Sequence, residues 1–336
     1  MTTQKTRIGL IGTGRIGQLH AENIAANPDI QLAWVADPFV DGARTIAARF
    51  GGTPTNDATE ILDRKRVDAV LVASPTPTHI DLIEACIDHG LPVLCEKPID
   101  LDISRVNRLR AKVASSDVPV ALGFNQRFDP GFAEAHRRVS AGEIRDVEQL
   151  TIVSRDLAAP PESYIAVSGG IFRDMTIHDF DMARFFLGDV VEVSATGSCL
   201  FDEGARRQGD DDTVVVTLKA RTGAIATIIN SRHSAIGYEQ RLEAFGAGGV
   251  IQVVNAPSSL VSRSGAQGVE TKSPYIESFL DRYAAAYAAE LAEFIKLTRG
   301  EASTSPTVED GRAALMIADA AQRAAQERTV VTIGAE

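Results

Sequence analysis

The sequence predicts a two-domain α/β protein: a doubly wound parallel sheet in the first third of the chain, then an α/β domain whose strands are mostly antiparallel. Two observations predict the first part. Short apolar runs alternate with helical segments up to residue 124, and a glycine-rich turn directly follows the first run. The third observation concerns the later strands, which join through short glycine turns typical of antiparallel pairing. We therefore place one domain at residues 1–124 and the other at residues 125–336.

The composition of the chain argues against two classes of binding partner, nucleic acids and membranes. A formal net charge of −11 over 336 residues argues against nucleic acid or an anionic membrane as the main partner. No apolar run reaches the roughly 20 residues of a membrane span, and Met1–Lys5 leads into a strand-like segment without the apolar region of a signal peptide. Cys86, Cys95 and Cys199 are widely spaced and odd in number, so we expect buried reduced thiols, no metal site and a cytoplasmic location.

The first apolar run, Arg7–Ile11, is expected to be a buried parallel strand. It feeds the turn Gly12-Thr13-Gly14-Arg15-Ile16-Gly17, and a helix over residues 16–27 follows. Gly12 permits the tight turn, Gly14 lets a pyrophosphate approach the backbone, and Gly17 lets the helix pack closely on the strand. The helix directs its free N–H groups and positive dipole end at the phosphates. We therefore expect dinucleotide contacts from Gly12, Gly14, Arg15, Ile16 and Gly17.

The residue after the second strand indicates which nicotinamide cofactor is bound. The strand over residues 32–36 ends at Asp37, twenty residues beyond Gly17, where a ribose-binding carboxylate is expected. A carboxylate repels the 2′-phosphate of NADP, and no arginine follows immediately, since Pro38 and Phe39 come next. The alternative is an ordinary strand-end aspartate beside a proline turn. The sequence favours NAD over NADP.

The remaining strands of the first domain end in two polar loops. Expected helices cover 41–50, 57–62 and 79–89, and expected strands cover 67–73, 92–95 and 118–123. Ligands of open parallel sheets bind at the carboxyl ends of the strands. Two groups of residues stand there: Ser74, Thr76 and His79 in a proline-punctuated loop, and Glu96 and Lys97 before Pro98. We assign all five to the cofactor side. Lys97 could also be a solvated strand end, but its place beside Glu96 and Pro98 favours a function.

The stretch Gly169–Asp181 holds a second group of polar residues. Two glycines open it, and an apolar rhythm through Ile171, Met175 and Met182 predicts one helix. Asp174 and His178 are four residues apart, so this helix would stack them on one face. A carboxylate beside an imidazole holds its orientation and favours its charged form, as a general base requires. The same spacing also occurs on helices for solvation alone.

These motifs together resemble the Gfo/Idh/MocA oxidoreductase family, and within it the bacterial inositol 2-dehydrogenases. The resemblance covers essentially the whole chain, and its most specific segments are Glu96-Lys97-Pro98, Gly123–Asp129, Ser168–Arg184, Asn230-Ser231-Arg232 and Gly237–Arg241. It implies a catalytic set of Lys97, Asp174 and His178. It also implies a C-terminal domain with a large open sheet that is commonly used for tetramer assembly.

The second domain has a different pattern. A helix is expected over 130–141, and strands over 146–154, 190–200, 213–219, 224–231, 240–245, 250–254, 259–262 and 329–333. Further helices are expected over 283–299 and 308–327, and the latter could pack back on the first domain. A loop over 155–167 could flank a substrate. Because helices cover only one face of such a sheet, we expect a homo-oligomer, with a tetramer favoured by the resemblance.

The resemblance implies NAD-dependent oxidation of a secondary hydroxyl of a cyclitol, with myo-inositol as the leading substrate. His178 would act as the base, Asp174 would orient it, and Lys97 would donate a hydrogen bond to the reacting oxygen. Expected substrate contacts come from Arg127, Asp156, Asp174, His178 and Tyr238. We expect Asp179 near the site and Asp181 in a structural role. Ordinary surface or loop positions are expected for the histidines His20, His79, His89 and His136, of which His79 alone lies near the cofactor edge.

Two alternatives to this reading remain. The substrate could be another inositol isomer, such as scyllo- or chiro-inositol, or an aldohexose. The chain could also be a non-catalytic NAD-binding regulator, but the presence of Lys97, Asp174 and His178 together argues against that class.

Overall fold

The computed structural model describes residues 5–266, 268–271 and 273–334. The chain divides into two compact units. Unit 1 comprises Met1–Asn125 and Ala286–Ala313, and unit 2 comprises Gln126–Ala285 and Ala314–Glu336. By compactness, residues 286–313 therefore group with the first unit, whereas the predicted boundary after residue 124 assigns them to the second domain.

Unit 1 is built on a six-stranded parallel sheet in the order β3-β2-β1-β4-β5-β6. Its strands are β1 (Thr6–Ile11), β2 (Ile30–Ala36), β3 (Thr53–Thr55), β4 (Ala69–Val72), β5 (Val93–Glu96) and β6 (Val120–Gly123). The central strands read as continuous apolar runs because both faces of the sheet are covered. The order reverses beside β1, which makes the sheet doubly wound, as predicted.

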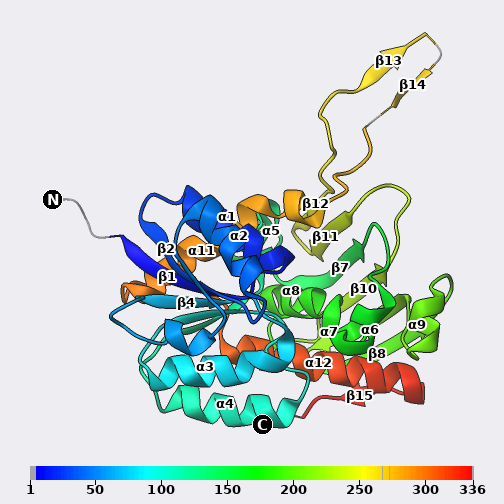
Figure 1. Cartoon of the computed structure of the whole chain (residues 1–336). Coiled ribbons are helices and arrows are strands. Elements are labelled where there is room, and N and C mark those ends of the chain that lie inside the picture. Colours follow the sequence, from blue (N-terminus) through cyan, green and yellow to red (C-terminus); the bar gives the residue numbers. More distant parts are fainter. Residues whose placement is uncertain (1–4, 267, 272, 335–336) are drawn as a thin grey trace. The chain divides into compact units, whose positions relative to one another are not determined.

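Helices cover both faces of this sheet. They are α1 (Arg15–Ala26), α2 (Val40–Phe50), α3 (His79–Asp88), α4 (Ile103–Ala114) and α11 (Ala284–Thr298), with the 3₁₀ turns η1 (Ala58–Ile61) and η2 (Thr76–Thr78). In Figure 1, α3 and α4 lie on one side of the sheet, and α1, α2 and α11 lie on the other. Leu291 and Phe294 of α11 join Ile8 and Leu10 of β1 in one buried cluster. A distant part of the sequence thus completes the core of unit 1.

Unit 2 is built on a seven-stranded mixed sheet in the order β12-β11-β7-β10-β9-β8-β15. Its strands are β7 (Val147–Arg155), β8 (Val190–Ser198), β9 (Thr213–Ala220), β10 (Ile225–Ser231), β11 (Glu239–Gly246), β12 (Gly249–Val253) and β15 (Val331–Thr332). Only β7 and β10 pair in parallel; the other described pairs are antiparallel. The predicted fold class is therefore confirmed for both domains.

The predicted strand over residues 259–262 is wrong. The strands in this region are β13 (Arg263–Gly265) and β14 (Gly268–Thr271), which form a separate hairpin that extends beyond β12 in Figure 1. Leu260 and Val261 are 94% and 75% exposed. Apolar residues such as these favour a strand only where a sheet face can bury them, and this segment lies outside the seven-stranded sheet.

The helices of unit 2 depart from the prediction at one functionally relevant point. They are α5 (Pro130–Ser140), α6 (Glu162–Ser168), α7 (Ile171–Asp174), α8 (Ile177–Leu187), α9 (Glu203–Arg207), α10 (Phe279–Arg282) and α12 (Val308–Glu327), after the 3₁₀ turn η3 (Asn125–Phe128). The single helix predicted through Asp174 and His178 is wrong, since α7 ends at Asp174 and α8 begins at Ile177. The N–H groups of Met175 and Thr176 both donate to the carbonyl of Ile171, at 3.0 and 2.9 Å, which closes α7 with a tight turn.

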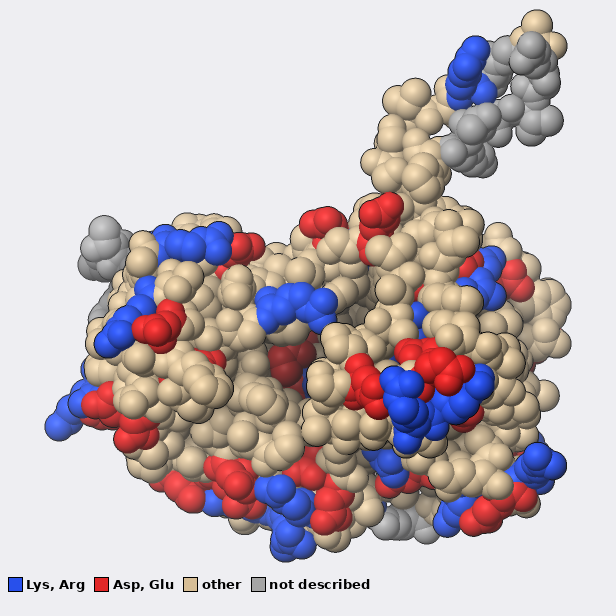
Figure 2. Space-filling model, turned by 45° about the vertical axis from the view of Figure 1, so that its right-hand side comes forward, with Lys and Arg blue, Asp and Glu red and all other residues tan. Residues whose placement is uncertain are grey.

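The surface carries charges of both signs. Acidic and basic side chains are interspersed on the face that Figure 2 shows. Of the helices in the described part of the chain, none combines the length and apolar character that crossing a membrane requires. Cys86 and Cys95 are buried thiols, as expected, whereas Cys199 is only half-buried. Burial raises the pKa of Cys86 to about 12.

Candidate functional site

The glycine loop of unit 1 has the geometry of a pyrophosphate cradle. Gly12 has a φ of +100°, and a Cβ there would lie 2.5 Å from the carbonyl oxygen of Ala73. A Cβ on Gly17 would lie 2.1 Å from the carbonyl oxygen of Gly12, so α1 packs directly against the turn. A Cβ on Gly14 would meet no atom within 4 Å. The two close positions need glycine, while the backbone at Gly14 is accessible at the start of α1, so this loop fits the phosphates of a dinucleotide.

Asp37 is tied to this loop. Its Oδ2 accepts hydrogen bonds from the backbone N and the Oγ1 of Thr13, at 2.9 and 2.7 Å, and its Oδ1 accepts from the backbone N of Phe39 at 2.9 Å. Residues 24 apart in the sequence thus hold the carboxylate at the carboxyl end of β2. A ribose contact from Asp37 remains a prediction, and its fixed, half-buried position suits one.

A buried histidine links the two other predicted cofactor loops. The ring of His79 lies between two carbonyl oxygens, with Nε2 2.8 Å from Ser74 O and Nδ1 2.8 Å from Pro98 O. His79 is buried, so the surface or loop position expected for it is wrong. Burial lowers the pKa of the ring, while the two carbonyl contacts raise it. The Lys97–Pro98 peptide bond is cis. The structure therefore holds the loop after β4 and the loop after β5 together, whereas direct contacts of Ser74, Thr76 and His79 with a cofactor stay predictions.

The surface or loop position expected for His20 is wrong. Its side chain is fully buried on α1, and its Nε2 lies 2.7 Å from Oε1 of Glu96. The helix that follows the glycine loop is therefore joined through a side-chain contact to the residue before Lys97. Glu96, predicted on the cofactor side, points its carboxylate at this histidine.

In unit 2, a pair of glycines positions Asp174. Gly169 and Gly170 have φ values of +87° and +84°, and this left-handed backbone separates α6 from α7. Asp174 is the last residue of α7, and its Oδ1 accepts a hydrogen bond of 2.8 Å from the hydroxyl of Tyr164 on α6. Its Oδ2 lies 3.6 Å from Nη1 of Arg232. The carboxylate is thus oriented from two sides.

Arg232 is the central cation of this group. Its side chain is fully buried directly after β10, and its Nη2 lies 3.1 Å from Oδ2 of Asp210. Oδ1 of Asp210 accepts from the backbone N of Ile171 at 3.0 Å, which ties the pair to the first residue of α7. Tyr164 and Arg232 were not predicted as partners of Asp174, nor Asp210 as the partner of Arg232. The acidic run at 210–212 and the arginine that ends a buried strand were the available signals.

His178 is the second residue of α8 and is half-buried. Because the helix is broken between α7 and α8, the four-residue spacing does not by itself stack His178 on Asp174, and their contact stays a prediction. Both residues belong to unit 2, while Lys97 belongs to unit 1. Their joint catalytic role remains a prediction.

The predicted substrate residues lie in different settings within unit 2. Arg127 donates from Nε and Nη2 to the two carboxylate oxygens of Asp181, at 2.7 and 2.5 Å, which gives Asp181 the structural role expected of it. Asp156 follows β7 and donates its backbone N–H to Ser231 O at 3.0 Å, so it lies where the parallel strands β7 and β10 end. The ring of Tyr238 lies 6.0 Å from that of Tyr283. Substrate contacts of Arg127, Asp156 and Tyr238 stay predictions.

Asp179 lies in a buried network below these strand ends. It accepts hydrogen bonds from Oγ of Ser154 at 2.7 Å and Nδ2 of Asn230 at 2.6 Å. Burial raises its pKa to about 6, against the opposing effect of both hydrogen bonds. Gln240 extends the network, since its Oε1 accepts from Ser154 and from the hydroxyl of Tyr283, both at 3.1 Å. This network fixes the strands that carry Asp156 and Arg232.

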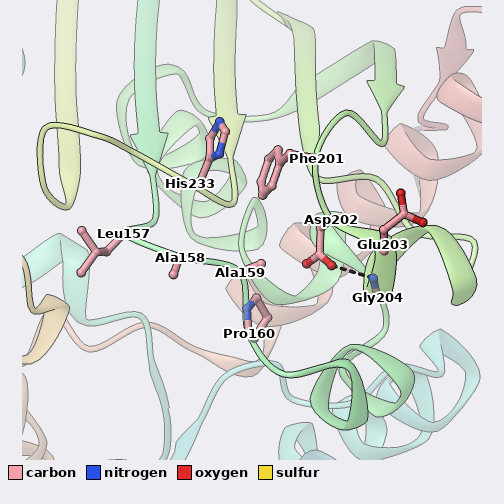
Figure 3. A pocket seen from close by; sticks show the side chains of 9 residues that line it. All are labelled: Leu157, Ala158, Ala159, Pro160, Phe201, Asp202, Glu203, Gly204 and His233. Atoms are coloured by element: carbon pink, nitrogen blue, oxygen red, sulfur yellow. Dashed lines mark hydrogen bonds between the residues drawn. The ribbon is translucent and has the colours of Figure 1, made fainter.

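A pocket of about 550 Å³ also lies in unit 2 (Figure 3). Residues 157–160 of the predicted substrate loop line one side, and residues 201–204 and His233 line the other. The rings of Phe201 and His233 stack at 3.7 Å. The loop predicted over 155–167 is shorter than expected, since Arg155 ends β7 and residues 162–167 belong to α6; its residues 157–160 border this pocket.

Comparison with known proteins agrees with both units. Residues 6–124 match the profile described as an oxidoreductase family, NAD-binding Rossmann fold, and residues 132–252 match the GFO/IDH/MocA C-terminal domain. The chain is 43% identical over 329 residues to an inositol 2-dehydrogenase of Rhizobium meliloti, which covers 97% of this chain and 99% of that protein. The chain belongs to the Gfo/Idh/MocA oxidoreductase family. The first unit of this family member therefore carries an NAD-binding Rossmann fold, and the predicted cofactor is confirmed.

Solved structures of the Gfo/Idh/MocA family superpose closely. A myo-inositol dehydrogenase from Corynebacterium glutamicum has a TM-score of 0.95 at 47% identity, covering 99% of this chain and 100% of that one. A scyllo-inositol dehydrogenase from Lactobacillus casei, with bound NAD(H) and scyllo-inositol, has a TM-score of 0.90 at 28% identity, covering 98% and 99%. Similar chains thus act on more than one inositol isomer.

Proposed function

We propose that this chain is an NAD-dependent dehydrogenase that oxidises a secondary hydroxyl of a cyclitol, with myo-inositol giving 2-keto-myo-inositol as the leading reaction. The observation that carries the proposal is its full-length similarity to inositol 2-dehydrogenases at 43% and 47% identity. It is supported by the presence of Lys97, Asp174 and His178 at the places where the family resemblance expects the catalytic set.

Three residues of the chain would remove the hydroxyl proton and stabilise the negative charge that develops on the reacting oxygen. His178 takes the hydroxyl proton as general base, and Asp174 orients the ring and stabilises the imidazolium. Tyr164 and Arg232 hold the Asp174 carboxylate from two sides, which is the support that such an orienting group needs. Lys97 donates a hydrogen bond to the reacting oxygen and stabilises its alkoxide character. NAD, when bound, accepts the hydride.

Substrate recognition in this proposal relies on directional polar contacts from unit 2. Arg127, Asp156 and Tyr238 are the residues we propose for the remaining ring hydroxyls, together with Asp174 and His178. A polyol ring is distinguished from its isomers by such contacts, because a site built to hydrogen-bond a hydroxyl rejects a ring that presents it in another direction. Arg127 would act while paired with Asp181, which keeps its guanidinium in place.

A second candidate substrate is scyllo-inositol, which the similarity to the Lactobacillus casei enzyme favours. Other inositol isomers and aldohexoses remain in the substrate panel below. A regulator that binds NAD without turnover is the alternative class, and an inactive but NAD-binding protein would favour it.

We also propose a cytoplasmic homo-oligomer, with a tetramer favoured. One face of the unit 2 sheet carries half-exposed apolar side chains on four strands, in two neighbouring pairs that β7 separates: β9 with β10, and β11 with β12. They are Val215, Ile225, Phe245 and Val250, which are 39% to 48% exposed. The strand register puts all four on the same face. A second copy of the chain would bury this face. Light scattering coupled to size exclusion tests the assembly, and a Phe245→Glu variant should shift it toward smaller species.

The direct test of the reaction is NADH formation, followed by absorbance, with purified protein, NAD and a panel of inositol isomers and aldohexoses. We expect selective turnover of myo-inositol. A Lys97→Ala variant, purified in the same way, controls for contaminating dehydrogenases and should lose activity by on the order of 10²-fold or more. Turnover of another polyol would change the proposed substrate but leave the proposed roles of the catalytic residues unchanged. Absence of turnover across the panel, with NAD bound, would contradict the proposal.

A further inference from the structure

Unit 1 contains a buried cluster of ionisable groups that the reaction scheme above does not use. It consists of His20 on α1, Glu96 at the end of β5 and Glu290 on α11, and one polar atom of each lies within 4.8 Å of the others. The three residues are 0%, 9% and 1% exposed. His20 and Glu96 are 76 positions apart in the sequence, and Glu96 and Glu290 are 194 apart, so the cluster forms only when unit 1 folds.

The protonation of this cluster is constrained by its burial. Both carboxyl oxygens of Glu290 and Nδ1 of His20 are buried and have no hydrogen-bond partner among the described residues. An ionised Glu290 would then be a second buried carboxylate next to that of Glu96, without a compensating donor. Burial, followed by the charge of Glu96, raises the pKa of Glu290 well above its usual range.

A metal ion shared by the three residues is the other way to balance such a cluster. The contact between His20 Nε2 and Glu96 Oε1 argues against it, because this distance is 2.7 Å. Two ligand atoms at tetrahedral zinc, each about 2.1 Å from the metal, are about 3.4 Å apart. The short contact is a hydrogen bond, and it uses the atoms that a shared ion would need.

We propose that Glu290 is a neutral carboxylic acid and that, with His20 and Glu96, it acts as a positioning residue for Lys97. This inference rests on the catalytic role of Lys97 in the proposed function. The neutral acid puts no second negative charge beside the carboxyl group of Glu96, which keeps its contact with His20, so that the end of β5 is held in one place. Because Lys97 is the next residue, its backbone position is fixed together with that of Glu96.

The surroundings of Glu96 support this positioning role. Oε2 of Glu96 lies 2.9 Å from the site of a Cβ on Gly123, which leaves no room for a side chain on the paired strand β6. The ring of His20 packs edge-on against Tyr287 of α11, with centroids 5.5 Å apart. On the far side of Lys97, the carbonyl of Pro98 bonds to buried His79. Lys97 therefore lies between two residues that are each tied to a buried imidazole.

The protonation is tested by infrared spectroscopy at about pH 8, independently of activity. We expect a carbonyl stretch of a buried carboxylic acid that disappears in Glu290→Gln. Glu293→Gln is the matched control, since Glu293 lies on the same helix and pairs with Lys296. Burial alone would raise the pKa of Glu293, but its hydrogen bonds, with that of Lys296 foremost, lower it overall. The Glu293→Gln variant should keep the band. A wild-type protein without the band, or one that carries a stoichiometric metal lost in Glu290→Gln, overturns the proposal.

The positioning role is tested by kinetics on folded protein. Glu290→Ala should lower kcat for the polyol by about 10- to 100-fold while the Kd for NADH stays within about twofold, because a displacement near 1 Å has costs of this order. Glu290→Gln, which resembles the neutral acid, should recover most of the loss. A lower Tm with kcat unchanged in both variants would mean a purely structural role and overturn the proposal. If the wild type turns over no polyol, the proposed function and the positioning role fail together, while the infrared band still decides the protonation.

Discussion

The ion group around Arg232 offers a quantitative test of how the Asp174 side of the site is held. The guanidinium is fully buried and lies 3.1 Å from a carboxylate oxygen of Asp210 and 3.6 Å from one of Asp174. Both acidic side chains are at most 14% exposed. The perturbation is Arg232→Met, which keeps an unbranched side chain and removes the charge.

The expected loss follows from leaving two buried carboxylates without their cation. Breaking a buried ion pair by removing one partner costs about 3–5 kcal/mol of unfolding free energy. In a domain of 150–250 residues each kcal/mol lowers Tm by about 2–4 °C, so Arg232→Met should lower Tm by about 6–20 °C. Burial raises the pKa of Asp210, and the charge of Arg232 counteracts this rise. Without Arg232 the carboxyl group of Asp210 should therefore bind a proton more readily.

The pH dependence separates this electrostatic cost from a packing cost. A carboxyl group whose pKa is raised in the folded protein stabilises it at low pH, and the stabilisation is lost as pH rises through that pKa. The deficit of Arg232→Met should thus be smaller at about pH 5 than at about pH 8, by urea unfolding. Arg207→Met, which removes an exposed pair with Glu162, is the control and should leave stability unchanged. A deficit below about 1 kcal/mol, or one equal at both pH values, would refute the reasoning.

Three further predictions concern the cofactor, the lysine and the buried acid. Asp37→Ala should weaken NADH binding more than NADPH binding in fluorescence titrations, since only the unphosphorylated ribose uses the carboxylate; an equal loss would remove Asp37 from the ribose site. Lys97→Ala should nearly abolish turnover while NADH still binds, because the glycine loop is unchanged; loss of binding would contradict its catalytic role. The pKa of Asp179 rises from 3.8 to about 6, so the folded protein keeps a proton that the unfolded chain releases, and stability should fall by about 2 kcal/mol between pH 4 and 6. Asp179→Asn should flatten this part of the pH–stability curve, and an unchanged curve would assign the slope to other groups.

The first domain was predictable from the sequence because its signals are local. A buried parallel strand needs a continuous apolar run, and the tight turn after it needs glycine at Gly12 and Gly17, where added Cβ atoms would lie 2.5 and 2.1 Å from backbone oxygens. The strand ends that carry Asp37 and Lys97 follow from the same pattern. The antiparallel pairs β9–β10 and β11–β12 were likewise indicated by the short glycine turns between them.

The break between α7 and α8 was not predictable from periodicity. The apolar residues keep a helical spacing through Met175, but the carbonyl of Ile171 accepts two N–H groups and ends the helix there. The hydrogen-bond pattern at such a turn depends on packing around buried Thr176, which the spacing of apolar residues does not encode.

The sequence by itself determined the fold class, the glycine loop and the identity of the residues proposed for catalysis, because each depends on a short segment or on a recognisable motif. Only the tertiary structure decided which side chains support them. Arg232 reaches Asp174 across 58 residues, and Glu290 reaches Glu96 across 194. Such pairs arise where strands and helices from distant segments bury polar groups together, and a buried charge must then find its partner in space rather than along the chain.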